Sequence, residues 1–197
     1  MNEFVIEANS CLARDTKAYY HYDYVGYQKL GNPDFINDLK NQFNNFSNEK
    51  LSLASLELKA ILETDLIKFG RGYTICVVPR AKAQNTYSRR QLGFKYTINR
   101  FLNNNISIFE NGVDYIIRHT NTRTTHLKGH DMDGAIPYKG ITKDTCFITN
   151  VQGKKIILID DIYTKTVNID EDCIQALYDN GADEVLFYAV AKTVEKY

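Results

Sequence analysis

The segment 154–168 (KKIILIDDIYTKTVN) limits the folds that this chain can adopt. It begins with an apolar run, which is followed by two adjacent aspartates and a polar loop. Residues 155–159 are β-compatible and are bounded by charge on both sides, so they predict a buried strand. A polar loop at 163–168 follows Asp160 and Asp161. Asn168, with Glu171 three residues later, has the pattern of a capping box and predicts the start of a helix.

The residues after this loop complete a repeating unit. Ile174, Leu177 and Tyr178 fall on one face of the predicted helix, and Gly181 marks its end. A second apolar strand is predicted at 185–190. A strand, a helix and a second strand over this length predict a right-handed parallel crossover. We therefore expect an α/β fold with a three-layer, mostly parallel sheet.

The rest of the chain contains further elements of the same kind. Apolar spacing predicts one helix with Phe35, Ile36, Leu39 and Phe43 on its inner face, and an amphipathic second helix. We expect an N-terminal helical segment at 1–72 and a core at 73–197, together forming one compact unit. The predicted helices are 33–46, 51–69 (apolar face Leu53, Leu56, Ala60, Leu62 and Ile67) and 88–104, and the further strands are 74–78, 113–117 and 146–151.

Residues 19–27 (YYHYDYVGY) are rich in tyrosine and alternate well enough to predict a strand or a hairpin. Alternation places Tyr20, Tyr22 and Tyr24 on one face. Such a face can stack on a nucleobase or on single-stranded nucleic acid. It can equally pack on the domain as an ordinary aromatic strand, and we favour this second interpretation.

The strand that ends in Asp160 and Asp161 is the best candidate for a functional site. Ligands of parallel α/β sheets bind beyond the carboxyl ends of the strands. A loop that enters a helix offers backbone N–H groups and a positive dipole end to a phosphate. Thr164 and Thr166 add hydroxyl groups, and Lys165 adds a positive charge. The pattern therefore predicts an anion site beside two carboxylates that can hold ribose hydroxyls or magnesium-bound water.

These residues also resemble a known motif. The segment 157–169 (ILIDDIYTKTVNI) is similar to the phosphoribosyl-pyrophosphate (PRPP) motif of type I phosphoribosyltransferases, and most similar to that of the ComF family, the amidophosphoribosyltransferase-like competence proteins. The resemblance continues in 176–190 (ALYDNGADEVLFYAV), where a helix ends in a Gly-Ala step before a strand. Upstream, 77–80 (VVPR), 89–94 and 117–125 (IIRHTNTRT) resemble the family's pyrophosphate loop, its Arg-Gly-Phe segment and its flexible loop. The similarity covers about 74–193.

The resemblance implies transfer of a ribosyl group between PRPP and a nitrogen nucleophile, with magnesium as cofactor. It also implies a variable hood over the active site, for which 1–30 and the helix that follows are the candidates. A homodimer and a protein partner in DNA uptake or phage defence are further expectations. The implied site residues are Asp160 and Asp161 as catalytic and magnesium-binding groups, Tyr163, Thr164, Lys165, Thr166, Val167 and Asn168 for the 5′-phosphate, Arg80 and Lys82 for the pyrophosphate, and Arg118 in a closing segment at 118–128.

The chain departs from the family pattern in the phosphate loop. The family has Thr-Thr-Gly-Ala-Thr where this chain has TKTVN at 164–168, and Thr166 lacks the conformational freedom of glycine. Asp170, Glu171 and Asp172 follow, and they would repel a bound phosphate. Two alternatives therefore stay open beside the transferase: a catalytically retired nucleotide sensor or scaffold, and an effector that cleaves nucleosides or NAD in the same pocket.

Charge and cysteine usage exclude some classes of protein. The formal net charge of zero argues against tight autonomous binding of DNA. Four scattered cysteines lack the spacing of a zinc ribbon, and Cys76 and Cys146 lie in apolar runs that predict buried thiols. No signal peptide or long apolar run is evident, so we expect a cytoplasmic protein without a membrane segment.

The polar connection at 118–137 holds three of the four histidines, His119, His126 and His130. Long connections of this kind are usually lids or disordered segments, and a lid over PRPP fits the resemblance. The histidine spacing matches no zinc site. Asp131, Asp133 and Gly134 hint at a calcium loop but lack its remaining ligands.

Overall fold

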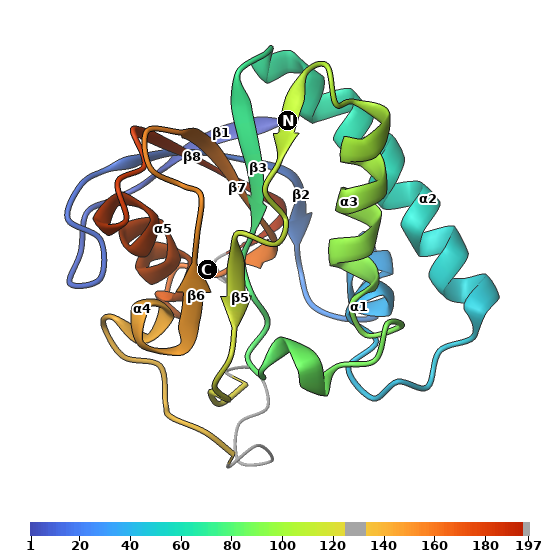
Figure 1. Ribbon diagram of the computed structural model, residues 1–197. Helices are drawn as coiled ribbons and strands as arrows, with labels where there is room; N and C mark the ends of the chain where they lie inside the picture. Colours follow the sequence, from blue (N-terminus) through green and yellow to red (C-terminus); the bar gives the residue numbers. More distant parts are fainter. Residues whose placement is uncertain (125–132, 195–197) are drawn as a thin grey trace.

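The computed structural model describes residues 1–124 and 133–194. Its centre is a six-stranded sheet in the order β1-β2-β8-β7-β3-β4. All neighbouring strands are parallel except β1, which pairs antiparallel with β2 at one edge. The predicted α/β class with a mostly parallel sheet is therefore confirmed (Figure 1). The strands are β1 (Asn2–Ile6), β2 (Thr16–Tyr24), β3 (Tyr73–Val77), β4 (Phe109–Asn111), β7 (Lys155–Tyr163) and β8 (Glu184–Thr193).

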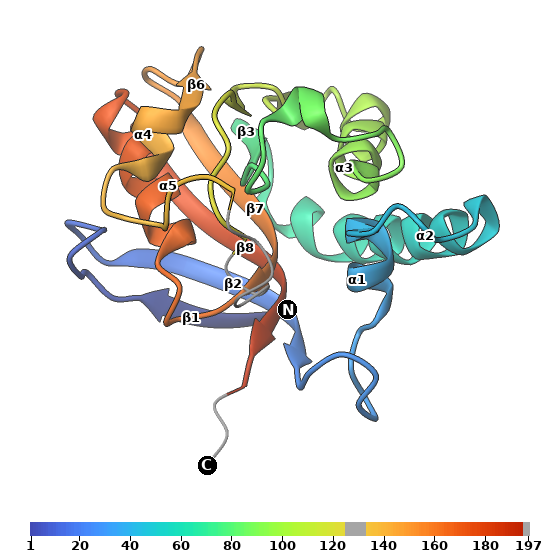
Figure 2. The same cartoon turned by 90° about the horizontal axis from the view of Figure 1, so that it is seen from below.

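Helices cover both faces of this sheet (Figures 1 and 2). The crossover from β7 to β8 contains α5, as the sequence predicts. The helices are α1 (Phe35–Lys40), α2 (Asn48–Asp65), α3 (Gly93–Asn104), α4 (Ile141–Thr145) and α5 (Ile169–Asp179), with 3-10 turns η1 (Leu66–Phe69) and η2 (Gln84–Thr86).

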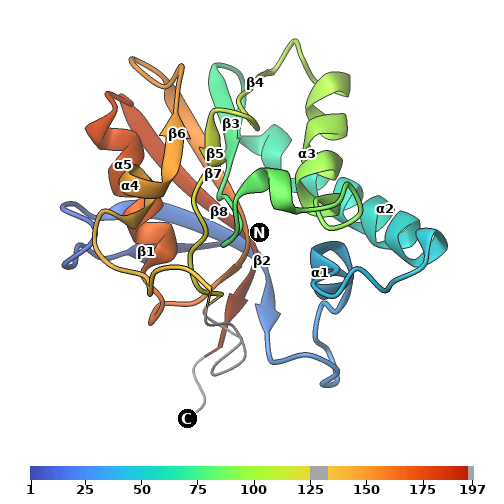
Figure 3. The ribbon, with the colours of Figure 1, turned by 60° about the horizontal axis from the view of Figure 1, so that its bottom comes forward.

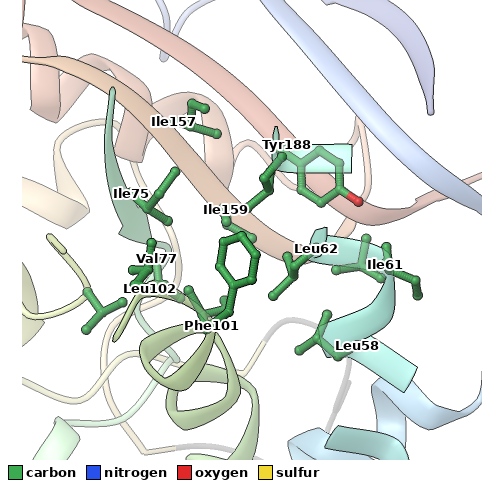
Figure 4. Packing of buried hydrophobic residues seen from close by; sticks show 14 of the residues in the cluster. Leu58, Ile61, Leu62, Ile75, Val77, Phe101, Leu102, Ile157, Ile159 and Tyr188 are labelled. Carbon is green, nitrogen blue, oxygen red and sulfur yellow. The ribbon is translucent and has the colours of Figure 1, made fainter. Parts of the chain in front are cut away.

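Two hydrophobic cores lie on the two faces of the sheet. The first core contains Ile157 and Ile159 of β7 and packs against α1, α2 and α3 (Figure 4). The second core contains Ile156 and Leu158 of the same strand and packs against α5. Successive side chains of a strand point to opposite faces, so the continuous apolar run of β7 supplies both cores at once. This explains why its sequence is apolar at every position rather than at every second one.

The N-terminal residues belong to the central sheet. β2 pairs in parallel with β8, and β1 adds the antiparallel edge. The expected strand at 19–27 therefore forms, but it extends the core sheet and is not a separate layer. Tyr22 and Tyr24 pack on the first core and Tyr20 on the second, so the predicted common face is wrong and the structural interpretation of these tyrosines holds.

The apolar face predicted for the second helix is wrong for most of its residues. α2 buries Ala54, Leu58, Ile61 and Leu62 and leaves Leu53, Leu56 and Ala60 exposed, and Ile67, which lies beyond the helix in η1, is exposed as well. Only Leu62 belongs to both sets. The helix therefore carries a second, outward-facing apolar stripe, since Leu53, Leu56 and Ala60 recur at helical spacing.

A small two-stranded antiparallel sheet, β5 (Ile116–Arg118) and β6 (Cys146–Ile148), lies beside the carboxyl end of the main sheet (Figure 3). The sequence predicts strands in both regions but misses β4 and the short helix α4. All four cysteines are buried free thiols, as predicted for Cys76 and Cys146. Among the described residues, no helix is both long enough and apolar enough to cross a membrane.

Candidate functional site

A pocket of about 160 Å³ opens at the carboxyl ends of β3 and β7. Parallel α/β sheets bind their ligands at this edge. Five of the predicted site residues lie around it: Arg80, Lys82, Arg118, Asp160 and Asp161. The structure also adds Lys40, from the end of α1, and Lys95, from α3, so positive charges outnumber carboxylates among the lining residues.

Asp160 and Asp161 lie within β7, which continues to Tyr163, so the strand does not end before them as predicted. The alternation of the strand turns the two carboxylates toward different layers. Asp161 accepts an ion pair from Lys40 of α1, with the Lys40 Nζ 3.0 Å from its Oδ1. Asp160 instead shares a hydrogen bond with Asp170 of α5. Both line the pocket, but each already has a partner.

The Asp160–Asp170 pair holds a proton at neutral pH. Burial and the neighbouring charge of Asp161 raise the pKa of Asp160 to about 7. Burial and Asp160 raise the pKa of Asp170 well above its usual value, which places the shared proton on Asp170. Burial opposes the charge of Lys40, but the two aspartates outweigh it and keep the pKa of Lys40 above its usual value. The pocket wall therefore contains Asp160, whose partner Asp170 carries the shared proton, and one firmly charged ammonium, that of Lys40.

Arg80 follows β3 and is held by neutral acceptors. Its guanidinium donates to the carbonyl oxygens of Lys40 (2.6 Å) and Gln91 and to the side-chain oxygen of Gln42 (2.6 Å). The group also stacks on the ring of Tyr87, 4.3 Å from its centroid. Because its acceptors are carbonyl and amide oxygens, its positive charge has no carboxylate partner among the described residues.

Arg118, at the end of β5, is buried and is also held by neutral acceptors. Its Nε donates to the carbonyl oxygen of Arg80 (2.7 Å), and an Nη donates to the hydroxyl of Thr145. Within the described part of the chain, Arg118 also has no carboxylate partner. A buried cation whose charge is not neutralised is costly unless a ligand or counter-ion compensates it. Arg80 and Arg118 therefore make the pocket electropositive.

Lys82 lies further out and contacts the connection that follows β5. Its ammonium donates to the carbonyl oxygens of Thr122 (3.0 Å) and Asp133 (2.6 Å). The amide N–H of Thr122 in turn donates to the carbonyl oxygen of Ala81 (2.8 Å). The connection is therefore fastened to the loop after β3. The remainder of the predicted lid, with His126, Lys128, His130 and Asp131, lies outside the described residues.

The backbone of the loop after β3 also carries hydrogen-bonding groups at the pocket. The carbonyl oxygens of Arg80 and Ala81 are occupied by Arg118 and Thr122. The amide N–H groups of Arg80 and Ala81 find no acceptor in the described residues, and both residues line the pocket. Free amide donors beside two guanidinium charges form an arrangement that binds oxyanions.

The residues predicted to hold a 5′-phosphate lie elsewhere. Tyr163 is buried in the second core, and the loop after it turns toward the N-terminal segment. The Thr164 hydroxyl hydrogen-bonds that of Thr193 (2.7 Å), and Lys165 pairs with Glu7 (3.3 Å). Thr166 is exposed, and the amide N–H of Val167 closes a turn onto the Thr164 carbonyl oxygen (3.1 Å). None of the residues 163–168 lines the pocket.

The predicted capping box at Asn168 does not form. Asn168 has a left-handed backbone (φ 57°) and its side chain makes no cap bond; its oxygen accepts from Asn9 (3.4 Å). Glu171 instead accepts from the hydroxyl of Tyr163 (2.9 Å). Asp172 accepts from the amide N–H groups of Gly140 (2.5 Å) and Thr142 (2.8 Å). The acidic first turn of α5 is therefore buried and structural.

The carboxylates do not offer magnesium a ready set of ligands. Asp161 already has an ammonium partner, and Asp160 shares a proton with Asp170. In the described residues, no three His, Cys, Asp or Glu side chains gather in a way that would hold a metal ion. His119 is turned away and stacks on Phe147, with ring centroids 4.3 Å apart.

Sequence reasoning missed Lys40, Lys95 and Asp170 as parts of the site. Lys40 ends a six-residue helix and belongs to no motif. Lys95 lies on α3 and pairs with Asp114 (2.7 Å). Asp170 is noted in the sequence only as one of three acids near a helix start. Asp170 comes ten residues after Asp160, so of these three residues it is the one that a local sequence pattern could have assigned to the site.

Comparison with protein-family models gives no match for the chain, and no curated protein shows significant similarity to it.

Proposed function

We propose that this chain binds a phosphorylated ribose or nucleotide through its pyrophosphate or phosphate group, in the pocket at the carboxyl ends of β3 and β7. The observation that supports the proposal most strongly is the pair Arg80 and Arg118, two guanidinium charges held by neutral oxygens at the pocket wall. An anion there would supply the missing negative charge. Phosphoribosyltransferase-like chemistry is the reaction class to which this binding belongs.

The residues of the pocket have distinct roles in this proposal. The amide N–H groups of Arg80 and Ala81 donate to the phosphate oxygens, and the two guanidinium groups supply the field that holds the anion. Lys40 and Lys95 add charge at the rim. Asp161, paired with Lys40, accepts from ribose hydroxyls, and Asp160 provides a group that accepts or releases a proton near neutral pH. In a transfer reaction, both would face the positive charge that develops on the sugar.

A second candidate, a sensor that binds the ligand without transferring ribose, is favoured by the loop at 164–168. This loop contacts the N-terminal segment and contributes no residue to the pocket. A ligand that is held only through its pyrophosphate group is bound but not positioned for reaction, because positioning requires contacts at both ends of the substrate. The two candidates share a binding step and differ in turnover.

Calorimetric titration with inorganic pyrophosphate, ribose 5-phosphate and PRPP tests the binding step. We expect pyrophosphate and PRPP to bind more tightly than ribose 5-phosphate, because the cationic groups gather at the β3 loop. Lys40→Met should weaken binding of each ligand about fivefold by removing one charge at the rim. Lys155→Met is the matched control, since Lys155 is an exposed lysine at the opposite end of β7. Absence of binding by all three ligands would refute the proposal.

Turnover separates the transferase from the sensor. Phosphorus NMR of the protein with PRPP, magnesium and a mixture of nucleobases or amine donors reports released pyrophosphate directly. Pyrophosphate release above the rate in Asp161→Asn supports the transferase. Tight binding of PRPP with no release in either protein supports the sensor.

A further inference from the structure

A groove between α2 and α3 has no role in the proposed function. It has a volume of about 340 Å³ and shares no lining residue with the pocket. Leu51, Ser55 and Leu56 of α2 form one wall, and Arg89, Arg90 and Arg100 form the other. A hydrogen bond between the hydroxyls of Ser55 and Thr97 (2.5 Å) joins the two walls. The two helices lie side by side on one face of the molecule (Figures 1 and 2).

The α2 wall carries two leucines, Leu51 and Leu56, among polar side chains. Leu56 belongs to the outward stripe of α2 and is 62% exposed, and Leu53 of the same stripe, 63% exposed, lies outside the lining of the groove. A helix with apolar residues on a second face usually buries that face against another element. Neighbouring exposed leucines at helical spacing are therefore more informative than scattered single ones.

The opposite wall carries positive charge without compensation. Among the described residues, Arg89, Arg90 and Arg100 form no ion pair, and no carboxylate lines the groove. Arg89 stacks on Tyr96, 5.4 Å from the ring centroid, and Arg90 donates to the carbonyl oxygen of Phe46. Both contacts leave the charges available to an anionic partner.

We propose that this groove, defined by Leu51, Ser55, Leu56, Arg89, Arg90 and Arg100, docks an acidic amphipathic helix of a partner protein. Such a helix places leucine-type side chains on the α2 wall and carboxylates on the arginine wall, the helix-in-groove mode of recognition. The groove face of α2 runs from Asn48 to Lys59, about 17 Å at 1.5 Å per residue, so the occupant spans about three helical turns.

The two walls together select this occupant over others. A nucleic acid would satisfy the arginines through its phosphates but leave Leu56 uncovered. A second copy of this chain, docked through the same groove, would bring the arginines no carboxylate, because a two-fold interface joins two copies of one surface and no carboxylate lines the groove. Only an occupant with both apolar and acidic faces matches both walls.

A designed peptide tests the proposal. The probe is a fluorescein-labelled 16-residue helix with leucines on one stripe and glutamates on the adjoining one, titrated with the full chain by fluorescence anisotropy. We expect saturable binding. Leu56→Ser should weaken it at least fivefold and Arg100→Glu at least tenfold. The matched controls are Leu30→Ser and Arg71→Glu, which change an exposed leucine and an exposed arginine outside the groove and should leave binding unchanged.

A peptide of reversed charge and competition with DNA distinguish the proposed occupant from the alternatives. A peptide with lysine in place of glutamate should bind Arg100→Glu more tightly than the unaltered chain. The proposal is overturned if the unaltered chain does not bind the glutamate peptide, or if a peptide of the same composition in scrambled order binds equally. It is also overturned if a 20-nucleotide DNA displaces the peptide at lower concentration. Self-association in sedimentation that Leu56→Ser abolishes would assign the groove to a second copy instead.

Discussion

Two loops leave neighbouring parallel strands at the same edge of the sheet, yet only one of them faces the pocket. The loop after β3, at 78–83, lines it with two occupied carbonyls, two amide N–H groups that have no acceptor in the described part of the chain, and the Arg80 guanidinium. The loop after β7, at 164–168, contacts Glu7, Asn9 and Thr193. The motif resemblance is strongest at the second loop, whereas the chemistry that suits an anion is strongest at the first.

The difference comes from what lies beneath each loop. Neutral acceptors surround Arg80 and Arg118, so the β3 side keeps a net positive charge. Buried carboxyl groups of α5 lie below the β7 loop, where a phosphate would meet repulsion. On the proposed function, a strand end at the carboxyl edge of a parallel sheet is therefore not enough to make a phosphate site, because the charge of the residues beneath each loop differs.

The largest expected effect concerns the buried carboxyl pair Asp160 and Asp170, on the side of the β7 loop. The folded pKa of Asp160 is about 7 against an unfolded value of 3.8, so the native state binds more protons between these values. The stability from this pair is full below about pH 4 and is lost as pH rises through about 7, by about 4 kcal/mol. Asp170→Asn should flatten this part of the urea-unfolding profile. Asp183→Asn, an exposed acid, is the control, and an unchanged profile in Asp170→Asn would contradict the shared proton.

The next effect concerns the arginines of the pocket wall, on the side of the β3 loop. Arg118→Met removes one uncompensated charge from the pocket wall, and we expect pyrophosphate affinity to fall about 30-fold, or about 2 kcal/mol. Calorimetry measures this loss, and circular dichroism checks that the variant is folded. Arg71→Met removes an exposed guanidinium near the opposite end of β3 and should bind as the unaltered chain does. Equal affinity in both variants would show that the β3 side is not the anion site.

A smaller effect is expected at the junction of the β7 loop and α5. Asn168 has φ 57°, a left-handed conformation that asparagine and glycine tolerate and alanine does not. Asn168→Ala should lower the free energy of unfolding by about 1 kcal/mol, while Asn168→Gly should change it little. Thermal unfolding of the three proteins measures both. Similar losses in the two variants would assign the role of Asn168 to its contact with Asn9 instead of its backbone.

The smallest effect is expected in the β7 loop itself. Thr166→Gly introduces the glycine that the phosphoribosyltransferase motif has at the corresponding place, but the loop lies outside the pocket, so pyrophosphate affinity should stay within about twofold. The added freedom of the unfolded chain should lower stability by about 0.5 kcal/mol. Titration of this variant beside Arg118→Met compares the two loops directly. Tighter binding in Thr166→Gly would return the phosphate to the β7 loop.

The sequence predicts the β7–α5–β8 unit well because its signals are local. A long apolar run, a helical stripe and Gly181 each act over a few residues. The extension of β7 through Asp160 and Asp161 was missed because polar residues normally mark the end of a strand, whereas these two are paired by Lys40 and Asp170. Both partners are set by packing, which no local pattern contains.

The apolar face of α2 shows a second limit. Leucines and isoleucines lie on both sides of this helix, so periodicity alone gives no unique inner face. The neighbouring elements choose the face that holds Leu58 and Leu62. In the candidate site, the sequence supplied Arg80, Arg118 and the two aspartates, but the direction of the β7 loop depends on Glu7 and Asn9, more than 150 residues away.

The position of β8 has a consequence for how the chain is made. β8 is the last strand in the sequence, yet it lies between β2 and β7 in the sheet. During synthesis, two parts of the sheet precede β8: the β1-β2 pair and the β7-β3-β4 group. Each part keeps an open hydrogen-bonding edge, at β2 and at β7, until residues 184–193 have left the ribosome. The sheet thus closes in one late, long-range step, when the nascent chain is most exposed to aggregation and to chaperones.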